Sequence, residues 1–181
     1  MRTVSTCLAA GLVLTYFALP ARAGEGSFID ELKIGVLAHD VPDLWSGFNR
    51  EDGIDINAEV LFSPSFSFLY GTVRPAAGAS INTAGGTSKF YLDARWQIGG
   101  ETGFFLGTGL GVAFNNGERS LISDDRKALG SNVLFHIPLE LGYRFEGGDS
   151  VSIYFEHMSN ANTQSSNEGL DDLGIRYGRR F

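Results

Sequence analysis

The sequence repeats one pattern eight times: a run of about 9 to 13 residues in which every second side chain is apolar. Clear runs occupy residues 53–62, 89–98, 104–114, 133–144, 151–159 and 171–181, and weaker ones lie near 31–39 and 72–82. In residues 89–98, Phe90 and Leu92 alternate with Asp93 and Arg95. A period of two indicates strands with one apolar face, so the sequence predicts an all-β fold.

The length of the runs and the chemistry of their polar side separate a membrane barrel from a soluble sandwich. Strands that cross a membrane at a tilt need roughly 9 to 11 residues, whereas strands of soluble sheets average about 5 to 6. The polar side mixes acids with bases that could pair inside a narrow lumen: Glu59, Asp93, Arg95, Glu140, Arg144, Glu156, Arg176 and Arg180. We therefore predict an eight-stranded antiparallel transmembrane β-barrel of the bacterial outer membrane.

The ends of the chain agree with export to that membrane. Arg2, the apolar run 8–19 and the small residues of Ala21-Arg22-Ala23 are typical of a secretory signal peptide, expected to span residues 1–23 and to be cleaved. The barrel domain is then residues 24–181 and contains no cysteine, because Cys7 lies in the leader. The final strand ends on Phe181, which resembles the C-terminal signal that the barrel-assembly machinery recognises.

Charge excludes one class of partner. Removing residues 1–23 takes two of the 14 basic residues and none of the 21 acidic ones, which leaves a net charge of −9. A nucleic-acid interface needs clustered positive charge. We therefore expect no nucleic-acid partner.

The predicted topology fixes the direction of every strand. With both ends of the barrel in the periplasm, the turns 99–102 and 146–149 are short, and the outer connections 40–52, 115–128 and 160–169 are longer. Residues 64–71 are expected to form a long apolar turn. Pro138 cannot donate to a strand ladder and predicts a bulge or a local break in the strand 133–144.

Two reactive side chains stand on the apolar side of the seventh run. Val151, Ile153 and Phe155 share their direction with His157 and Ser159, so both polar groups are expected to face lipid near the outer rim. Residues i and i+2 of a strand lie roughly 6.5 to 7 Å apart on one face, which an imidazole and a hydroxyl can bridge. A hydroxyl nucleophile needs such a base and a third group that orients it. The outward side of the last run places Asp171 opposite His157, whereas Glu168, the alternative acid, lies in the loop.

The C-terminal segment "HMSNANTQSSNEGLDDLGIRYGRRF" resembles the signature of the lipid A 3-O-deacylase (PagL) family. "DINAEVLF", "GASINTAG" and "GSNVLFHIPLELGYRF" also resemble that family, so the likeness covers most of the chain beyond the leader. It implies an outer-membrane barrel that hydrolyses the ester at the 3-position of lipid A, without metal or other cofactor.

Carried over by residue, the resemblance implies that His157 is the base, Ser159 the nucleophile and Asn160 an oxyanion donor. Asp171 stands where the family usually has Glu. Asn162 stands where the family often has a Gly whose backbone N–H assists the oxyanion.

The sequence is also compatible with other interpretations. The partners expected are lipopolysaccharide and outer-membrane lipids, and dimerisation of the barrel is left open. A non-catalytic structural or adhesion-type barrel would explain the fold but not the outward His157 and Ser159, and a phospholipid esterase could use the same three side chains. His136 is predicted to be a packed lumen residue, and a metal at His39 is the weaker alternative to a structural role.

Overall fold

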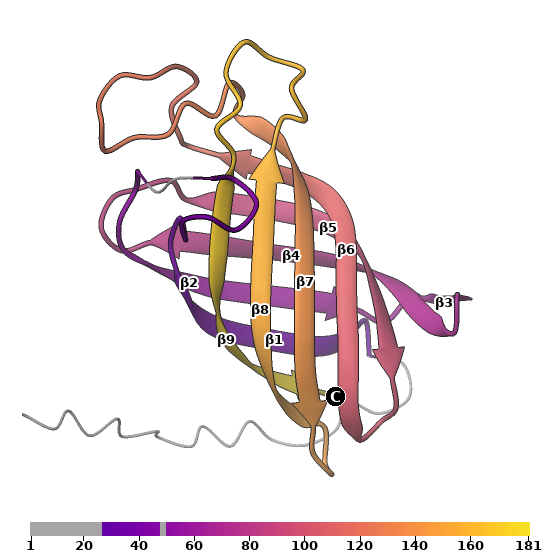
Figure 1. The fold of residues 1–181 in the computed structure, drawn as a ribbon. Helices are drawn as coiled ribbons and strands as arrows, with labels where there is room; N and C mark the ends of the chain where they lie inside the picture. The colour runs from indigo at the N-terminus through magenta and orange to yellow at the C-terminus, as the bar shows by residue number, and fades with distance from the viewer. Residues whose placement is uncertain (1–26, 48–49) are drawn as a thin grey trace, which may run out of the picture.

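The computed structural model describes residues 27–47 and 50–181 and consists of β-strands joined by loops and turns (Figure 1). The expected signal peptide, residues 1–23, lies outside the described residues. The strands are β1 (Ile29–Ala38), β2 (Ile54–Phe62), β3 (Phe66–Phe68), β4 (Gly71–Asn82), β5 (Lys89–Gly99), β6 (Gly103–Asn115), β7 (Val133–Arg144), β8 (Asp149–Ser159) and β9 (Leu170–Arg180). Within the described residues, no helix has the length and apolar character needed to span a membrane.

Eight long strands close into an antiparallel barrel, as predicted. Each pairs with its neighbours along the chain; β1 also pairs with β9, and β2 pairs with β4. The short strand β3 pairs only with the start of β4 and extends a hairpin from the segment expected to be an apolar turn. This strand was not expected from the sequence, which predicted a turn over residues 64–71.

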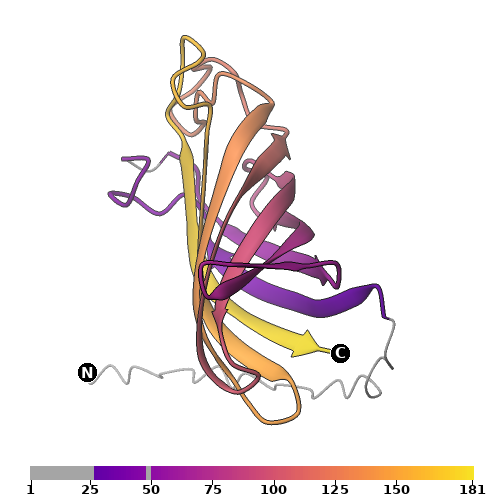
Figure 2. The same ribbon diagram turned by 90° about the vertical axis from the view of Figure 1, so that its right-hand side faces the viewer.

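The connections differ between the two ends of the barrel. The β1–β2, β6–β7 and β8–β9 loops gather at one end, whereas the tight β5–β6 and β7–β8 turns and the C-terminus lie at the other (Figures 1 and 2). This is the arrangement predicted for long outer loops and short periplasmic turns.

The two faces of the barrel wall have opposite chemistry. Large apolar side chains along the strands are exposed on the outside, among them Ile34, Val36, Ile56, Phe90, Leu92, Leu106, Leu141, Ile153 and Ile175. The charged side chains that the alternation assigned to the lumen are buried there, with Arg180 only partly covered. A buried charge must be paired, and the pairs are present: Glu140 binds Lys33, Arg95 and Arg176 at 2.7 to 3.0 Å.

Pro138 breaks a ladder without shifting its register. On the β8 side it pairs with Glu156, but on the β6 side the ladder is interrupted between Thr108–Leu139 and Gly111–His136. The Thr108 hydroxyl donates to the Pro138 carbonyl at 3.0 Å across this gap. The outcome is the predicted local break, with no bulge.

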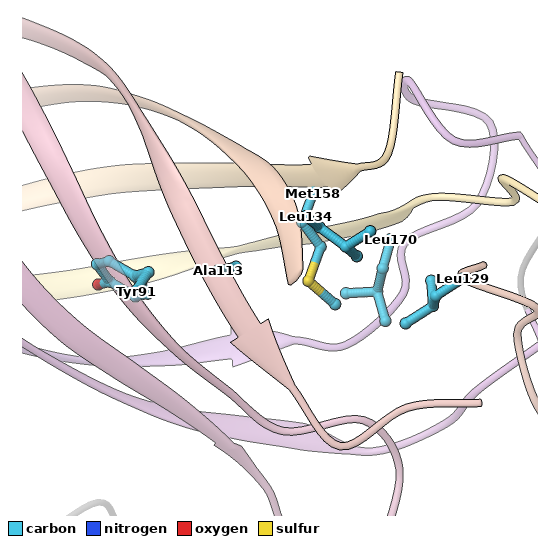
Figure 3. Close-up of a cluster of buried hydrophobic side chains, with 6 residues drawn as sticks. All are labelled: Tyr91, Ala113, Leu129, Leu134, Met158 and Leu170. Carbon is cyan, nitrogen blue, oxygen red and sulfur yellow. The ribbon is translucent and has the colours of Figure 1, made fainter. Parts of the chain in front are cut away.

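An apolar cluster fills the loop end of the lumen. Met158 and Leu170 are fully buried cross-strand neighbours on β8 and β9, and Leu134 and Leu129 pack beside them (Figure 3). Because Met158 follows His157 and Leu170 precedes Asp171, this cluster supports the inner side of the wall whose outer side carries the candidate site.

Candidate active site

β8 and β9 bring together the three side chains selected from the alternation. The imidazole Nε2 of His157 lies 2.9 Å from the Ser159 Oγ, and its Nδ1 lies 2.6 Å from the Asp171 Oδ1. His157 and Asp171 are direct partners in the β8–β9 ladder, so the strand register sets their separation. The three groups stand in the order of a Ser-His-Asp triad: the hydroxyl, then the imidazole, then the carboxylate.

The second oxygen of Asp171 is held by the β1–β2 loop. Its Oδ2 accepts the backbone N–H groups of Trp45 and Ser46 at 2.6 and 2.7 Å. Both carboxylate oxygens therefore have partners, and the carboxylate cannot rotate without losing them.

The site lies on the outside of the barrel but is not open. His157 shares its outward direction with exposed Val151 and Ile153, yet it is only 4% exposed. The indole of Trp45 covers it, with ring centroids 4.4 Å apart and planes inclined by 11°. Ser159 is half-buried, so the hydroxyl is the more accessible end of the arrangement.

Asn160 is placed as an anchor of the β8–β9 loop. Its side-chain amide is buried and donates to the carbonyls of Leu129 and Ser166 at 2.9 and 2.6 Å. Its backbone N–H donates to the Asn167 Oδ1 at 2.9 Å. The donors of Asn160 are thus already engaged in this arrangement.

The turn after Asn160 supplies other donors. Ala161 and Asn162 both adopt left-handed backbone conformations, with φ of 51° and 61°. Within the described part of the chain, their backbone N–H groups donate to no other residue. These are the main-chain donors that follow Ser159 and Asn160 most closely, and they include the position where the family often has Gly.

Glu168, the alternative acid, has other partners. Its Oε2 accepts the backbone N–H of Ala128 at 2.6 Å, and its Oε1 lies 3.3 Å from the Arg50 Nε. Glu168 therefore links three loops, whereas Asp171 contacts the imidazole.

A buried group at the loop end of the lumen offers metal-ligand chemistry. His39, Asp55 and Asp172 place one donor atom each within 4.8 Å of one another. Burial opposes charge on His39, but hydrogen bonds to Asp172, Asp55 and Glu51 outweigh it and raise the pKa of His39 to about 11. The Lys89 ammonium also pairs with Asp172. The imidazolium and the ammonium both form ion pairs with these carboxylates, so we interpret the group as an ion-pair network.

His136 occupies the lumen position predicted for it. It is fully buried, lies 3.0 Å from Asp93 and 3.1 Å from Glu156, and stacks on Tyr91. No described serine hydroxyl is hydrogen-bonded to it, so it does not form a second nucleophile pair.

Comparison with known protein families decides the identity of the chain. The family model described as lipid A 3-O-deacylase (PagL) matches residues 30–180. The chain belongs to the lipid A 3-O-deacylase (PagL) family. The expected resemblance is therefore confirmed over nearly all of the barrel.

Solved structures agree on the fold. The crystal structure of the outer membrane enzyme PagL matches with a TM-score of 0.63 and 21% identity, covering 83% of this chain and 99% of that one. The N-terminal β-barrel domain of Pseudomonas aeruginosa OprF matches with a TM-score of 0.50 and 13% identity, covering 83% and 97%. Neisserial surface protein A matches with a TM-score of 0.50 and 8% identity, covering 86% and 98%. A search of curated proteins finds no match.

The contribution of the loops to this site was not predicted from the sequence. Trp45 and Ser46 orient Asp171, Asn167 fixes Asn160, and Gly169 lies against the His157 ring. The backbone of Gly169 has a φ of 66°, and an added Cβ would lie 3.3 Å from the His157 Cε1. Gly169 was the one available signal, because a glycine two residues before the candidate acid can mark a position that needs a positive φ or a close approach of the backbone.

Proposed function

We propose that this protein is an outer-membrane lipid A 3-O-deacylase in which Ser159 is the nucleophile, His157 the general base and Asp171 the orienting acid. The observation that carries the proposal is the pair of contacts at the two imidazole nitrogens, 2.9 Å to Ser159 and 2.6 Å to Asp171. Membership of the deacylase family supplies the substrate class.

In the proposed mechanism the enzyme is first acylated. Nε2 of His157 takes the Ser159 proton as Oγ attacks the ester carbonyl, and Asp171 stabilises the imidazolium through Nδ1–H. Collapse of the tetrahedral intermediate breaks the bond to the sugar 3-oxygen. His157 returns the proton to that oxygen, leaving an acyl group on Ser159.

Hydrolysis completes the cycle. Water attacks the acyl-enzyme while His157 accepts one of its protons, and collapse of the second tetrahedral intermediate releases the fatty acid. His157 then returns the proton to Ser159, so the protein is unchanged after one turnover.

For the oxyanion, we propose the backbone N–H groups of Ala161 and Asn162. They follow the nucleophile in the chain and have no acceptor among the described residues. Asn160 contributes by holding this turn through its bonds to Leu129 and Ser166. Direct donation from the Asn160 amide, as the family resemblance implies, requires these bonds to open. Donors held in place before reaction stabilise developing charge at little reorganisation cost.

The location of the site supports a lipid substrate over a soluble one. His157 and Ser159 continue the apolar outward row of β8 and lie at the loop end of the barrel. If the loops face the cell exterior, this end reaches the outer leaflet, where lipopolysaccharide is the lipid. An acyl chain can then reach Ser159 along the membrane-facing wall.

The test is mass spectrometry of lipid A after incubation with refolded wild-type protein and with Ser159→Ala. We expect loss of one hydroxyacyl mass with the wild type alone. Activity of a folded Ser159→Ala variant would refute the nucleophile. Loss of acyl chains from phospholipid but not from lipid A would establish the phospholipid esterase instead, and no hydrolysis of either lipid by a folded barrel would favour a structural role.

A further inference from the structure

The β1–β2 loop reaches the catalytic strand through its backbone. Besides the two N–H groups on Asp171 Oδ2, the N–H of Val41 donates to the Asp171 carbonyl at 2.7 Å, and the N–H of Asp40 donates to the Asp172 Oδ1 at 3.0 Å. Four hydrogen bonds therefore tie residues 40–46 to two consecutive residues of β9. The loop is positioned as part of the site, not as a free connection.

A second set of contacts fixes the loop from inside. Asp40 accepts the backbone N–H groups of Arg50 and Glu51 through Oδ2, and the Lys127 ammonium lies 2.7 Å from its Oδ1. Lys127 also donates to the Ser46 hydroxyl at 3.3 Å. Both ends of the loop are thus anchored on buried charges, which limits the positions open to Trp45.

Trp45 presents its flat face to the catalytic base. Its ring lies nearly parallel to the His157 imidazole at 4.4 Å while 55% of the side chain stays exposed. Gly169 packs against His157 and Ser46, where a Cβ would come within 3.1 to 3.3 Å. The indole thus covers one face of the imidazole, Gly169 lies near its Cε1, and its two nitrogens face Asp171 and Ser159.

We propose that Trp45 is a positioning residue that holds His157 in its reactive orientation and stabilises the imidazolium formed when Ser159 loses its proton. The proposal rests on the proposed function. An aromatic face attracts a cation above it, and the attraction grows when water is excluded. The positive charge develops on His157 only during reaction, so this contact strengthens in the transition state.

A simpler role would be membrane anchoring or substrate contact, since exposed tryptophans gather at membrane interfaces. The two roles differ in what they change. A positioning residue affects the reactivity of Ser159 toward any electrophile, whereas a lipid-contacting residue affects only the binding of lipid A and hence KM.

The experiment compares Trp45→Ala, Trp45→Phe and the control Trp96→Ala in the folded barrel. Trp96 is the other tryptophan of the chain, and it lies on β5, where its indole donates to the Phe68 carbonyl, away from the site. The readouts are the labelling rate of Ser159 by a small fluorophosphonate, and kcat and KM with lipid A.

We expect Trp45→Ala to lower the labelling rate and kcat together by about three- to thirtyfold, the range corresponding to a cation–π contact. KM should change little, Trp45→Phe should restore most of the loss, and Trp96→Ala should match the wild type. Normal labelling with a raised KM would overturn the proposal in favour of lipid contact. Equal losses in Trp45→Ala and Trp96→Ala would also overturn it.

A spectroscopic measurement keeps the proposal separate from the catalytic mechanism. In Trp96→Phe, Trp45 is the only tryptophan, and its emission should change when His157 is replaced by Gln. Unchanged emission would refute the stacked contact even if lipid A hydrolysis is normal. Conversely, absence of Ser159 labelling in the wild type would refute the proposed nucleophile, whatever the emission shows.

Discussion

Replacing Asp171 by Asn should inactivate the enzyme more severely than the loss of one charge suggests. Oδ2 of Asp171 accepts two backbone N–H groups, from Trp45 and Ser46, and Oδ1 faces the His157 Nδ1. An asparagine must place its oxygen toward the two backbone donors, because the reverse orientation opposes donor to donor twice. Its NH2 group then faces Nδ1 of His157.

This orientation forces the wrong tautomer on the base. Nδ1 must accept from the amide, so Nε2 carries the proton and cannot take the proton of Ser159. The same substitution in the Ser-His-Asp triad of serine proteases lowers kcat by about 10⁴-fold, and we expect a loss of that order here. The shape of the site is retained, since Asn and Asp are nearly isosteric.

The assay is kcat for lipid A hydrolysis with fluorophosphonate labelling, on protein whose folding is checked by gel migration without heating and by circular dichroism. Asp171→Glu is the matched control, because the family usually has Glu at this position, and it should keep substantial activity. If Asp171→Asn retained more than about a tenth of wild-type kcat, the orienting role of Asp171 and the tautomer argument would both be refuted.

Gly169→Ala should lower kcat by about tenfold, because the new Cβ meets the His157 ring at 3.3 Å and small displacements of a base are costly. Gly147→Ala, at a φ of 94° with open space around it, carries similar backbone strain and should leave kcat unchanged; equal losses in both variants would contradict this. Glu140→Gln should destabilise the barrel by about 3 to 5 kcal/mol, since three buried cations lose their nearest carboxylate, and an unchanged urea midpoint would show that these pairs contribute nothing. Burial opposes charge on Glu51, but bonds from His39 and from the backbone of the neighbouring loops lower its pKa from 4.5 to about 2. The ionised form of Glu51 therefore stabilises the fold above pH 4.5, and about 3 kcal/mol of that stability should disappear between pH 4.5 and pH 2. Glu51→Gln should remove this part of the pH dependence. Identical unfolding curves of the variant and the wild type across that pH range would refute the assignment.

The fold and the three central residues could be predicted because side-chain direction in a strand is a local property. Once residues 151–159 are recognised as a strand, Ile153 and His157 must point to the same side. Asp171 follows from the register of a hairpin whose strands are neighbours in the chain. Neither inference needs information about the rest of the molecule.

The contribution of the loops could not be predicted in the same way, because a loop has no period that fixes its path. Trp45 and Ser46 contact Asp171 across 126 and 125 residues of sequence. Nothing in residues 40–52 indicates that contact. Asn160 illustrates the same limit, because its bonds to Leu129 and Ser166 depend on how two loops pack.

The β3 strand was missed for a different reason. Its three residues are too few to establish alternation, and Phe66 and Phe68 are both exposed, so burial gives no pattern. β2 pairs with β4 only over residues 76–82. The first residues of β4, 71–73, therefore pair with β3 and form the hairpin.

The pairing of β1 with β9 brings the two halves of the candidate site together. His157, Ser159 and Asp171 belong to one hairpin at the end of the chain, but the groups that hold Asp171 and cover His157 follow the first strand. Trp45 and Ser46 can contact Asp171 and His157 only when the first and last strands pair. Before the first and last strands pair, the chain would lack the hydrogen bonds from Trp45 and Ser46 to Asp171 and the indole that covers His157. Closure of the barrel would therefore complete the proposed site, and a chain that has not closed would hold only the contacts within the β8–β9 hairpin.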